Sequence, residues 1–216
     1  MLALSVSGTN GEMEVKKMTK PECRMSKENA FTLIELVVVI AIIAVLVGLA
    51  FPVFQGVLDR AKKMQAKNDL TQIVTAVNAF YTEYGRYPID STITTDAAAT
   101  FGGGSTGKPV LDELRAKSQT INTRQIVFIS PPEDTAQASP KGKVGSDAQF
   151  HDPWGTAYGF ELDANYDNQV TNPYGNSGGA GADPIRQGVI AWSLGKDLTL
   201  GKGGSYTNSD DVISWQ

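Results

Sequence analysis

The stretch that decides the fold is FTLIELVVVIAIIAVLVGLAFPVF, residues 31–54 of a 216-residue chain. It is apolar apart from Glu35, and no charged residue occurs from Leu36 to Leu58. That length is about the ~20 apolar residues that a helix needs to cross a hydrocarbon core. An ionised carboxylate at membrane depth costs roughly 2.5–3.5 kcal/mol on insertion scales, so we expect Glu35 to have a partner or a function.

The residues before the apolar stretch predict its orientation. An excess of Lys and Arg on one side of a membrane span favours the cytoplasmic side. We therefore expect a single membrane pass, with a cytoplasmic N-terminus and an exported C-terminal domain. The basic residues that precede the span are Lys16, Lys17, Lys20, Arg24 and Lys27.

A helical pattern continues beyond the apolar stretch. Apolar residues recur at three- and four-residue spacing while charged residues fill the opposite side, which is typical of an amphipathic helix. The pattern predicts one helix from about Thr32 to Tyr84, whose later apolar stripe must be covered by a small sheet. The residues of the stripe are Leu70, Ile73, Val74, Val77, Phe80 or Tyr81, and Tyr84.

Local signals predict where this helix ends and where it weakens. Gly85 suits a left-handed helix cap and Pro88 cannot continue a helix, so both act as stop signals. Pro52 removes one backbone donor and crowds the preceding turn, so we expect a kink or local melting there.

Shorter elements are expected in residues 85–216. Alternating and β-branched runs predict strands with hairpin-like spacing, and therefore an antiparallel sheet. Residues 91–108 are small and polar with a Gly triplet at 102–104, and 163–184 are rich in Asn and Gly, so both are expected to be irregular surface segments. The expected elements are a helix over Val110–Lys117 and strands over Gln125–Ile129, Ala157–Leu162, Gly188–Trp192 and Val212–Ser214.

Composition excludes several classes of function. The formal net charge is −4, without the clustered Lys and Arg that a nucleic-acid partner requires. The only Cys is Cys23, ahead of the apolar stretch, so the rest of the chain forms no disulfide. The only His is His151, beside a predicted turn, and no Ser sits in a GxSxG elbow between a strand and a helix. We therefore expect no enzyme, and we expect Trp154, Trp192 and Trp215 to anchor the core.

Four strings together resemble one known family. They are MSKENA–FTLIELVVVIAIIAVL at 25–46, GRYP at 85–88, DPWG at 152–155, and SLGKDLTLGKGGSYTNSDDVISW at 193–215. They are similar to type IV pilins and to the pseudopilins of type II secretion, the major pseudopilin above all. The resemblance implies an α+β, pilin-like "lollipop": a leader at 1–30 whose true start is Met25, a transmembrane half-helix at 31–58, an amphipathic half at 59–84 and a head at 85–216.

The same resemblance implies processing and assembly. A prepilin peptidase/methyltransferase would cut between Ala30 and Phe31 and methylate the new amine of Phe31. The residue before the cut is usually Gly in the family, and here it is Ala30. Glu35 would neutralise the amine of a neighbouring subunit. The implied partners are copies of this chain, other pseudopilins, an inner-membrane assembly platform and membrane lipid, in a filament that leaves the inner membrane for the periplasm.

A calcium site in the C-terminal tail is also implied. Calcium takes six to eight oxygen ligands from loops that can wrap it, and the tail offers such oxygens. Matching the family motif gives the ligands Asp197, Asp211, Asp210, Ser209 and the carbonyl of Leu194. The family pattern GxDG after SLG is altered, because Leu198 stands in the place of the last Gly. The alternative is that these acids only cap turns.

Other interpretations stay open. Asp163, Asn165 and Asp167 have the spacing that opens an EF-hand loop, but Asn168 stands where a Gly is required, which favours a turn. For the whole chain, the expected function is a structural subunit of a type II secretion pseudopilus. The alternatives are a type IV pilin for adhesion, motility or DNA uptake, and a monomeric membrane-anchored periplasmic binding module, in which Glu35 would be dispensable.

Overall fold

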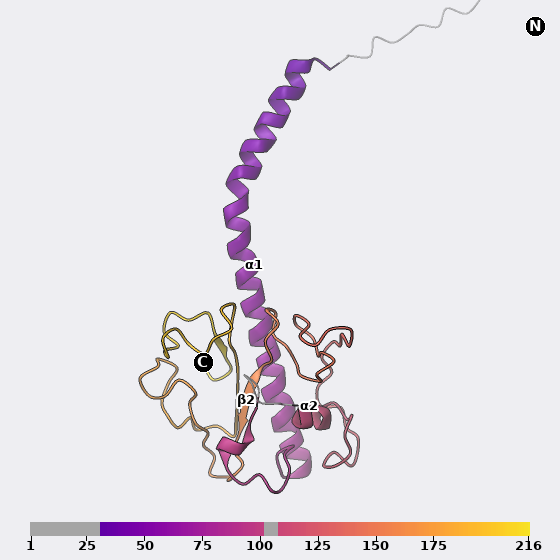
Figure 1. The fold of residues 1–216 in the computed structure, drawn as a ribbon, viewed down its shortest axis with the longest axis vertical. Coiled ribbons are helices and arrows are strands. Elements are labelled where there is room, and N and C mark those ends of the chain that lie inside the picture. Colours follow the sequence, from indigo (N-terminus) through magenta and orange to yellow (C-terminus); the bar gives the residue numbers. More distant parts are fainter. Residues whose placement is uncertain (1–30, 102–107) are drawn as a thin grey trace, which may run out of the picture. The chain divides into compact units, whose positions relative to one another are not determined.

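The computed structural model describes residues 31–101 and 108–216, without the side chains of residues 50–55, 98 and 108. The predicted leader, Cys23, Ala30 and the Gly triplet at 102–104 lie outside the described residues. The element order is α1 (Leu33–Tyr84), a 3-10 helix η1 (Asp96–Ala99), β1 (Thr100–Phe101), α2 (Lys108–Leu114), β2 (Gly159–Leu162), β3 (Val189–Ser193) and β4 (Val212–Ile213), as Figure 1 shows.

The chain divides into two compact units, residues 1–48 and 49–216. In the described part of the first unit, α1 exposes nearly all of its large apolar side chains. Phe31 and Leu33 are each 80% exposed and Ile40 is 56% exposed. Within the described residues, no helix combines the length and the apolar character that a membrane crossing requires.

The predicted long helix is confirmed, since α1 runs from Leu33 to Tyr84 without interruption at Pro52. Its end is also as predicted. Gly85 has φ +67° and donates its N–H to the carbonyl of Tyr81 at 2.8 Å. A residue with φ > 0 at this position ends the helix, and Gly adopts that conformation without a side-chain clash.

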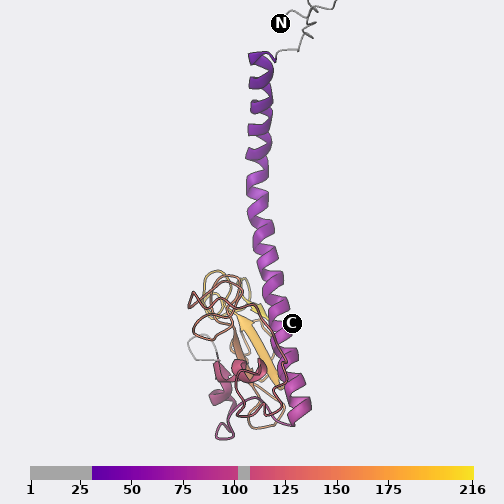
Figure 2. The same ribbon diagram turned by 90° about the vertical axis from the view of Figure 1, so that its right-hand side faces the viewer.

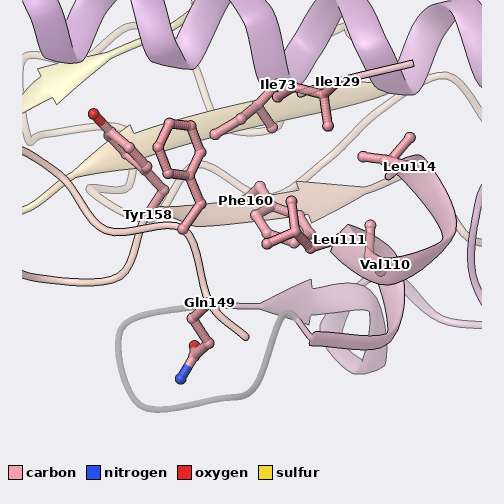
Figure 3. Close-up of a pocket in the computed structure, with 9 residues that line it drawn as sticks. Ile73, Val110, Leu111, Leu114, Ile129, Gln149, Tyr158 and Phe160 are labelled. Carbon is pink, nitrogen blue, oxygen red and sulfur yellow. The ribbon is translucent and has the colours of Figure 1, made fainter. Parts of the chain in front are cut away.

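In the second unit, the sheet and loops lie along one face of the C-terminal part of α1 (Figure 2). The sheet has the order β1-β2-β3-β4 and every pair is antiparallel, as predicted. The helix contributes its apolar stripe to the core, and Leu70, Val77 and Phe80 have no exposed area. Side chains of α1, α2 and β2 converge around a cavity of ≈ 20 Å³, where Figure 3 shows Ile73, Leu111 and Phe160.

Two sequence-based expectations for the loops are wrong. Residues 91–101 are not simply an exposed loop, because Ala99 and Phe101 are buried and β1 pairs with β2. Residues 163–184 are irregular but not merely on the surface. They build a second apolar cluster with the sheet, whose buried members are Val170, Tyr174, Ala180, Ile185, Ile190, Trp192, Leu194 and Ile213.

The expected strand over Gln125–Ile129 is also wrong, because its backbone groups form hydrogen bonds outside the sheet. The N–H groups of Phe128 and Ile129 donate to the carbonyl of Leu114, and Asn122 Oδ1 accepts the N–H of Ile126 at 3.0 Å. Gln125 has φ +52°, outside the extended region. The segment therefore wraps the end of α2, which stops at Leu114 and not at Lys117.

Candidate functional site

The start of α1 is fixed by a reciprocal pair of hydrogen bonds. Thr32 donates its N–H to Glu35 Oε2 at 2.8 Å, and Glu35 donates its N–H to Thr32 Oγ1 at 3.3 Å. The Thr32 hydroxyl also donates to Glu35 Oε2 at 2.8 Å. This is a capping box, which satisfies N–H groups that the first helical turn leaves without partners. The T-x-x-E spacing of Thr32 and Glu35 is the sequence signal for it, although no capping box was predicted.

The capping box gives Glu35 a local structural task beside the one predicted for it. Its hydrogen bonds go to Oε2, so the carboxylate is held at the first turn of α1. Phe31, at the predicted cut, is 80% exposed. Pairing of Glu35 with a neighbour's amine involves a second copy and stays a prediction.

The register of the sheet brings the predicted tail acids together. Pairing of Ser193 with Val212 places the chain leaving β3 beside the chain entering β4. Asp197 follows β3, and Asp210 and Asp211 immediately precede β4. One oxygen from each of these three carboxylates lies within 4.8 Å of the others. We call these three residues the tail cluster.

Asp211 is the buried member of the tail cluster, with 5% of its surface exposed. Its Oδ2 accepts the hydroxyl of Tyr174 at 2.6 Å and the N–H of Gly201 at 2.7 Å. Its Oδ1 is buried and has no hydrogen-bond partner among the described residues. Burial, with the neighbouring charges of Asp210 and Asp197, raises the pKa of the Asp211 carboxyl above its usual range. A buried, unpartnered carboxylate oxygen is costly unless a cation or donor satisfies it.

The other two members of the tail cluster face the loop backbone. Asp210 Oδ2 accepts the N–H groups of Lys196 and Asp197, the latter at 3.2 Å. Asp197 Oδ1 accepts the N–H of Thr199 at 3.0 Å. Gly195 lets the two chain segments approach, because a Cβ there would lie 2.7 Å from the carbonyl oxygen of Asp210. These bonds fix the loop around one oxygen each of Asp197 and Asp210.

The two remaining predicted ligands have different surroundings. Ser209 Oγ accepts the N–H of Asp211 at 3.3 Å and so helps to orient that residue. The side chain of Leu194 belongs to the second apolar cluster, at the point where the chain leaves β3. Coordination by the Ser209 hydroxyl or the Leu194 carbonyl stays a prediction.

Leu198, which replaces the family's Gly, retains a glycine-like backbone. Its φ is +61° and its side chain is 52% exposed. Left-handed backbone costs an L-residue roughly 1–2 kcal/mol. The tail loop therefore keeps the turn that the motif implies, at an energetic cost.

A second acidic cluster forms around the string that resembles an EF-hand opening. Asp96 of η1 joins Asp163 and Asp167, with one oxygen of each within 4.8 Å of the others. Asp163 accepts the N–H groups of Asp167 and Asn168, at 3.1 and 2.7 Å. Asp96 accepts the N–H of Ala164 at 2.9 Å. These carboxylates bind backbone N–H groups of one loop, in agreement with the predicted turn. No sequence pattern indicated that Asp96 joins them.

The DPWG motif is linked to the tail through a buried carboxylate. Asp152 is fully buried; its Oδ1 accepts the N–H groups of Trp154, Gly155 and Thr156. Its Oδ2 accepts the hydroxyl of Ser193 at 2.6 Å, and Ser193 Oγ accepts the N–H of Gly195 at 3.2 Å. Sequence reasoning missed this link, although both residues lie in the quoted motifs.

The remaining candidates for chemistry have structural roles. His151 is buried, with Nδ1 3.2 Å from the carbonyl oxygen of Gly155 and Nε2 3.0 Å from Asp147 Oδ2, so it fastens the turn as predicted. The cavity of ≈ 20 Å³ has room for about one water molecule, and its lining is apolar apart from Gln149 and Tyr158. Trp192 is buried, and Trp154 and Trp215 pack on the two apolar clusters, which confirms the predicted core anchors.

Comparison with known proteins finds a family motif in the N-terminal region and several similar proteins. The family model of the prokaryotic N-terminal methylation motif matches residues 25–51. The type IV major pilin protein PilA of Myxococcus xanthus is 41% identical over 61 residues, 28% of this chain and 28% of the relative. The fimbrial protein EcpC of Eikenella corrodens is 36% identical over 75 residues, 35% of this chain and 49% of the relative.

A further relative matches over a longer stretch. The type IV major pilin protein PilE of Neisseria gonorrhoeae is 31% identical over 99 residues, 46% of this chain and 59% of the relative. The chain thus spans between 28% and 59% of the length of these three relatives. No solved structure matches the chain significantly. The chain thus carries the prokaryotic N-terminal methylation motif over residues 25–51 and is similar to type IV pilins over the stretches that these relatives cover.

Proposed function

We propose that this protein is a filament subunit of a type II secretion pseudopilus. It would be made as an inner-membrane prepilin, cut between Ala30 and Phe31, methylated on Phe31 and polymerised through α1. The observation that carries the proposal is the methylation motif over residues 25–51, followed by a helix with an exposed apolar surface.

The exposed surface of α1 supports assembly. Among the described residues, the large apolar side chains from Leu33 to Leu49 are 46% to 80% exposed. Apolar surface in water costs roughly 25 cal/mol per Å², and contiguous patches of this kind indicate a membrane or protein interface. In the proposed cycle, lipid covers this surface before assembly and the helices of other copies cover it afterwards.

Glu35 would set the register of assembly. Its Oε2 is engaged in the capping box with Thr32, which leaves Oε1 to accept a hydrogen bond from the charged amine of a neighbouring Phe31. At low dielectric an unpaired charge is costly, so the arrangement in which both charges are paired is selected.

The tail cluster would bind Ca²⁺. Asp197, Asp210 and Asp211 supply three carboxylates, which are the hard oxygen ligands that calcium prefers. The buried Oδ1 of Asp211, without a partner among the described residues, fits a ligand to a cation. The Leu194 carbonyl and the Ser209 hydroxyl would complete the set, and the ion would fix the tail loop on the head.

A type IV pilin for adhesion, motility or DNA uptake is the second candidate, and the relatives favour it because they are named as pilins. The pseudopilin is preferred on the family resemblance of the tail, in which a metal loop replaces the disulfide that closes the last loop of many pilins. The only Cys of this chain, Cys23, lies in the predicted leader.

The first experiment is the intact mass and N-terminal peptide of the protein extracted from host membranes. The proposal expects a chain that begins with N-methyl-Phe31. A chain that retains residues before Phe31 would overturn it in favour of a monomeric anchored module. Deletion of the gene then separates the two machines: loss of protein secretion supports the pseudopilus, and loss of surface pili with normal secretion supports the pilin.

A further inference from the structure

Three tyrosines form an aromatic surface at the C-terminal end of α1. Tyr87 lies 4.8 Å from Tyr81 and 5.6 Å from Tyr166, measured between ring centroids, and its ring is stacked on that of Tyr166. Tyr81 is 39% exposed and Tyr166 is 52% exposed, whereas Tyr87 is buried beneath them. We call these three residues the tyrosine surface.

The loop after β2 holds Tyr166 in place on this surface. Tyr166 has φ +63°, a conformation that is uncommon for a bulky side chain. The loop is closed by Asp163, which accepts the N–H groups of Asp167 and Asn168, and by Asn165, which accepts the N–H of Asp167 at 2.8 Å. Burial and the charge of Asp163 raise the pKa of Tyr87 to about 12. The Asp163 carboxylate of this loop thus acts on the Tyr87 ring.

A surface of tyrosine rings beside carboxylates favours the binding of cations. The faces of tyrosine rings attract ammonium and guanidinium groups, and nearby carboxylates strengthen that preference. Asp96, Asp163 and Asp167 supply the negative charge, and their hydrogen bonds to the loop backbone argue that they shape the surface and do not hold a metal. The expected ligand is therefore a basic side chain.

The chain carries a matching surface elsewhere in the same unit. Arg60 and Lys63 lie three residues apart on one side of α1, and among the described residues neither of them forms an ion pair; the nearby pair joins Asp59 and Lys196 at 3.4 Å. Met64 beside them is 74% exposed. Arginine stacks on aromatic rings and thioether sulfur makes favourable contacts with ring edges, so both kinds of side chain suit a tyrosine surface. We call Arg60, Lys63 and Met64 the basic patch.

We propose that the basic patch of one copy binds the tyrosine surface of the next copy in the filament. This inference rests on the proposed filament function and names the contact that propagates it. Lys63 and Tyr81 are 18 residues apart in α1, which corresponds to about 27 Å along the helix axis. Because the two surfaces are different and lie apart, the contact is heterologous, and repeating it gives an open chain of subunits instead of a closed dimer.

Cysteine crosslinking of the full chain in its host membranes tests the contact. Cys23→Ser removes the one native thiol, and Met64→Cys marks the basic patch without removing a cation. Asn165→Cys marks the tyrosine surface without removing a ring, and Asp163 still holds the loop through the N–H groups of Asp167 and Asn168. Two singly substituted chains expressed together should give dimers with a short bis-maleimide, and the double variant should give a ladder of multimers. Either single variant alone should give neither. Val127→Cys, at an exposed site elsewhere on the head, replaces Asn165→Cys as the matched control and should give no dimer with Met64→Cys.

Charge reversal provides a second test of the same contact. Lys63→Glu should abolish the Met64→Cys/Asn165→Cys ladder, and adding Asp167→Lys should restore it. Filaments that form without the ladder would overturn this contact and leave the proposed function intact, as would crosslinks from Asn165→Cys to a different protein identified by mass spectrometry. Dimers of Met64→Cys alone would also overturn it. Uncut chains without filaments would instead contradict the proposed function.

Discussion

Each of the two acidic clusters of the head consists of three aspartates. The clusters differ in the hydrogen-bond partners of their carboxylate oxygens. In the cluster of Asp96, Asp163 and Asp167, backbone N–H groups of one loop occupy the carboxylates. In the tail cluster, Asp211 has a buried oxygen without a partner among the described residues. The comparison teaches that proximity of carboxylates alone does not define a metal site. An unsatisfied buried oxygen is the feature that separates a ligand from a turn former.

The largest expected effect is the response of the tail cluster to calcium. A ligand at 100 times its dissociation constant stabilises the native state by about 2.7 kcal/mol, which corresponds to a rise in Tm of several degrees. Asp211→Asn should abolish this rise, measured by thermal unfolding of the detergent-solubilised full chain with and without Ca²⁺. Asp167→Asn, the control in the other cluster, should leave it unchanged. An equal loss in both variants would erase the distinction between the clusters.

The cluster of Asp96, Asp163 and Asp167 should respond to truncation and not to metal. Asp163→Ala leaves the N–H of Asn168 without its acceptor, while the N–H of Asp167 keeps Asn165 Oδ1, so the cost is about 1–3 kcal/mol. The free energy of unfolding in urea should fall by that amount, equally with Ca²⁺ and with EDTA. A loss that calcium reverses would show that this cluster binds the ion after all.

A smaller effect concerns the backbone of the tail loop. Leu198 has φ +61°, and glycine would relieve its steric cost while adding flexibility to the unfolded chain. We expect Leu198→Gly to raise the free energy of unfolding by about 0.5–1 kcal/mol and to tighten calcium binding. Isothermal titration of the two chains measures the second effect. Weaker binding by the glycine variant would mean that the Leu198 side chain itself supports the site.

The smallest expected effect is on the pH dependence of stability, and it concerns Asp69, a buried carboxylate outside both clusters. Asp69 accepts the hydroxyl of Tyr158 at 2.8 Å, and burial raises its pKa above the ordinary value of 3.8. The native state therefore holds this proton more tightly than the unfolded chain, so stability falls as pH rises from 3.8 through the raised native pKa. Asp69→Asn should remove this part of the pH dependence and be slightly more stable at neutral pH. Urea titrations at several pH values measure it, and parallel curves for the two chains would contradict the assignment.

The sequence predicted what periodicity and local chemistry determine. From the sequence we expected the long helix with its glycine stop and the central residues of β2, β3 and β4. The proximity of Asp197, Asp210 and Asp211 was also expected. These features follow from apolar spacing, turn residues and a motif whose parts flank two paired strands. Such signals lie within short windows of sequence.

The features that were missed depend on contacts between distant residues. β1 has two residues and exists because Thr100 and Phe101 pair with Glu161 and Phe160. The expected strand at 125–129 was lost because Asn122 and the end of α2 take its backbone groups. Asp96 joins an acid pair more than sixty residues away, and no local pattern announces it.

The edges of the sheet bear on a hazard for any protein that polymerises. The outer strands, β1 and β4, have two residues each. Long unpaired edges offer a template on which further strands add, and that route leads to irregular aggregates or amyloid. An edge of two residues offers few backbone groups to such an incoming strand. In the proposed filament, where the local concentration is high, association through the helices would then meet little competition from strand addition at the sheet.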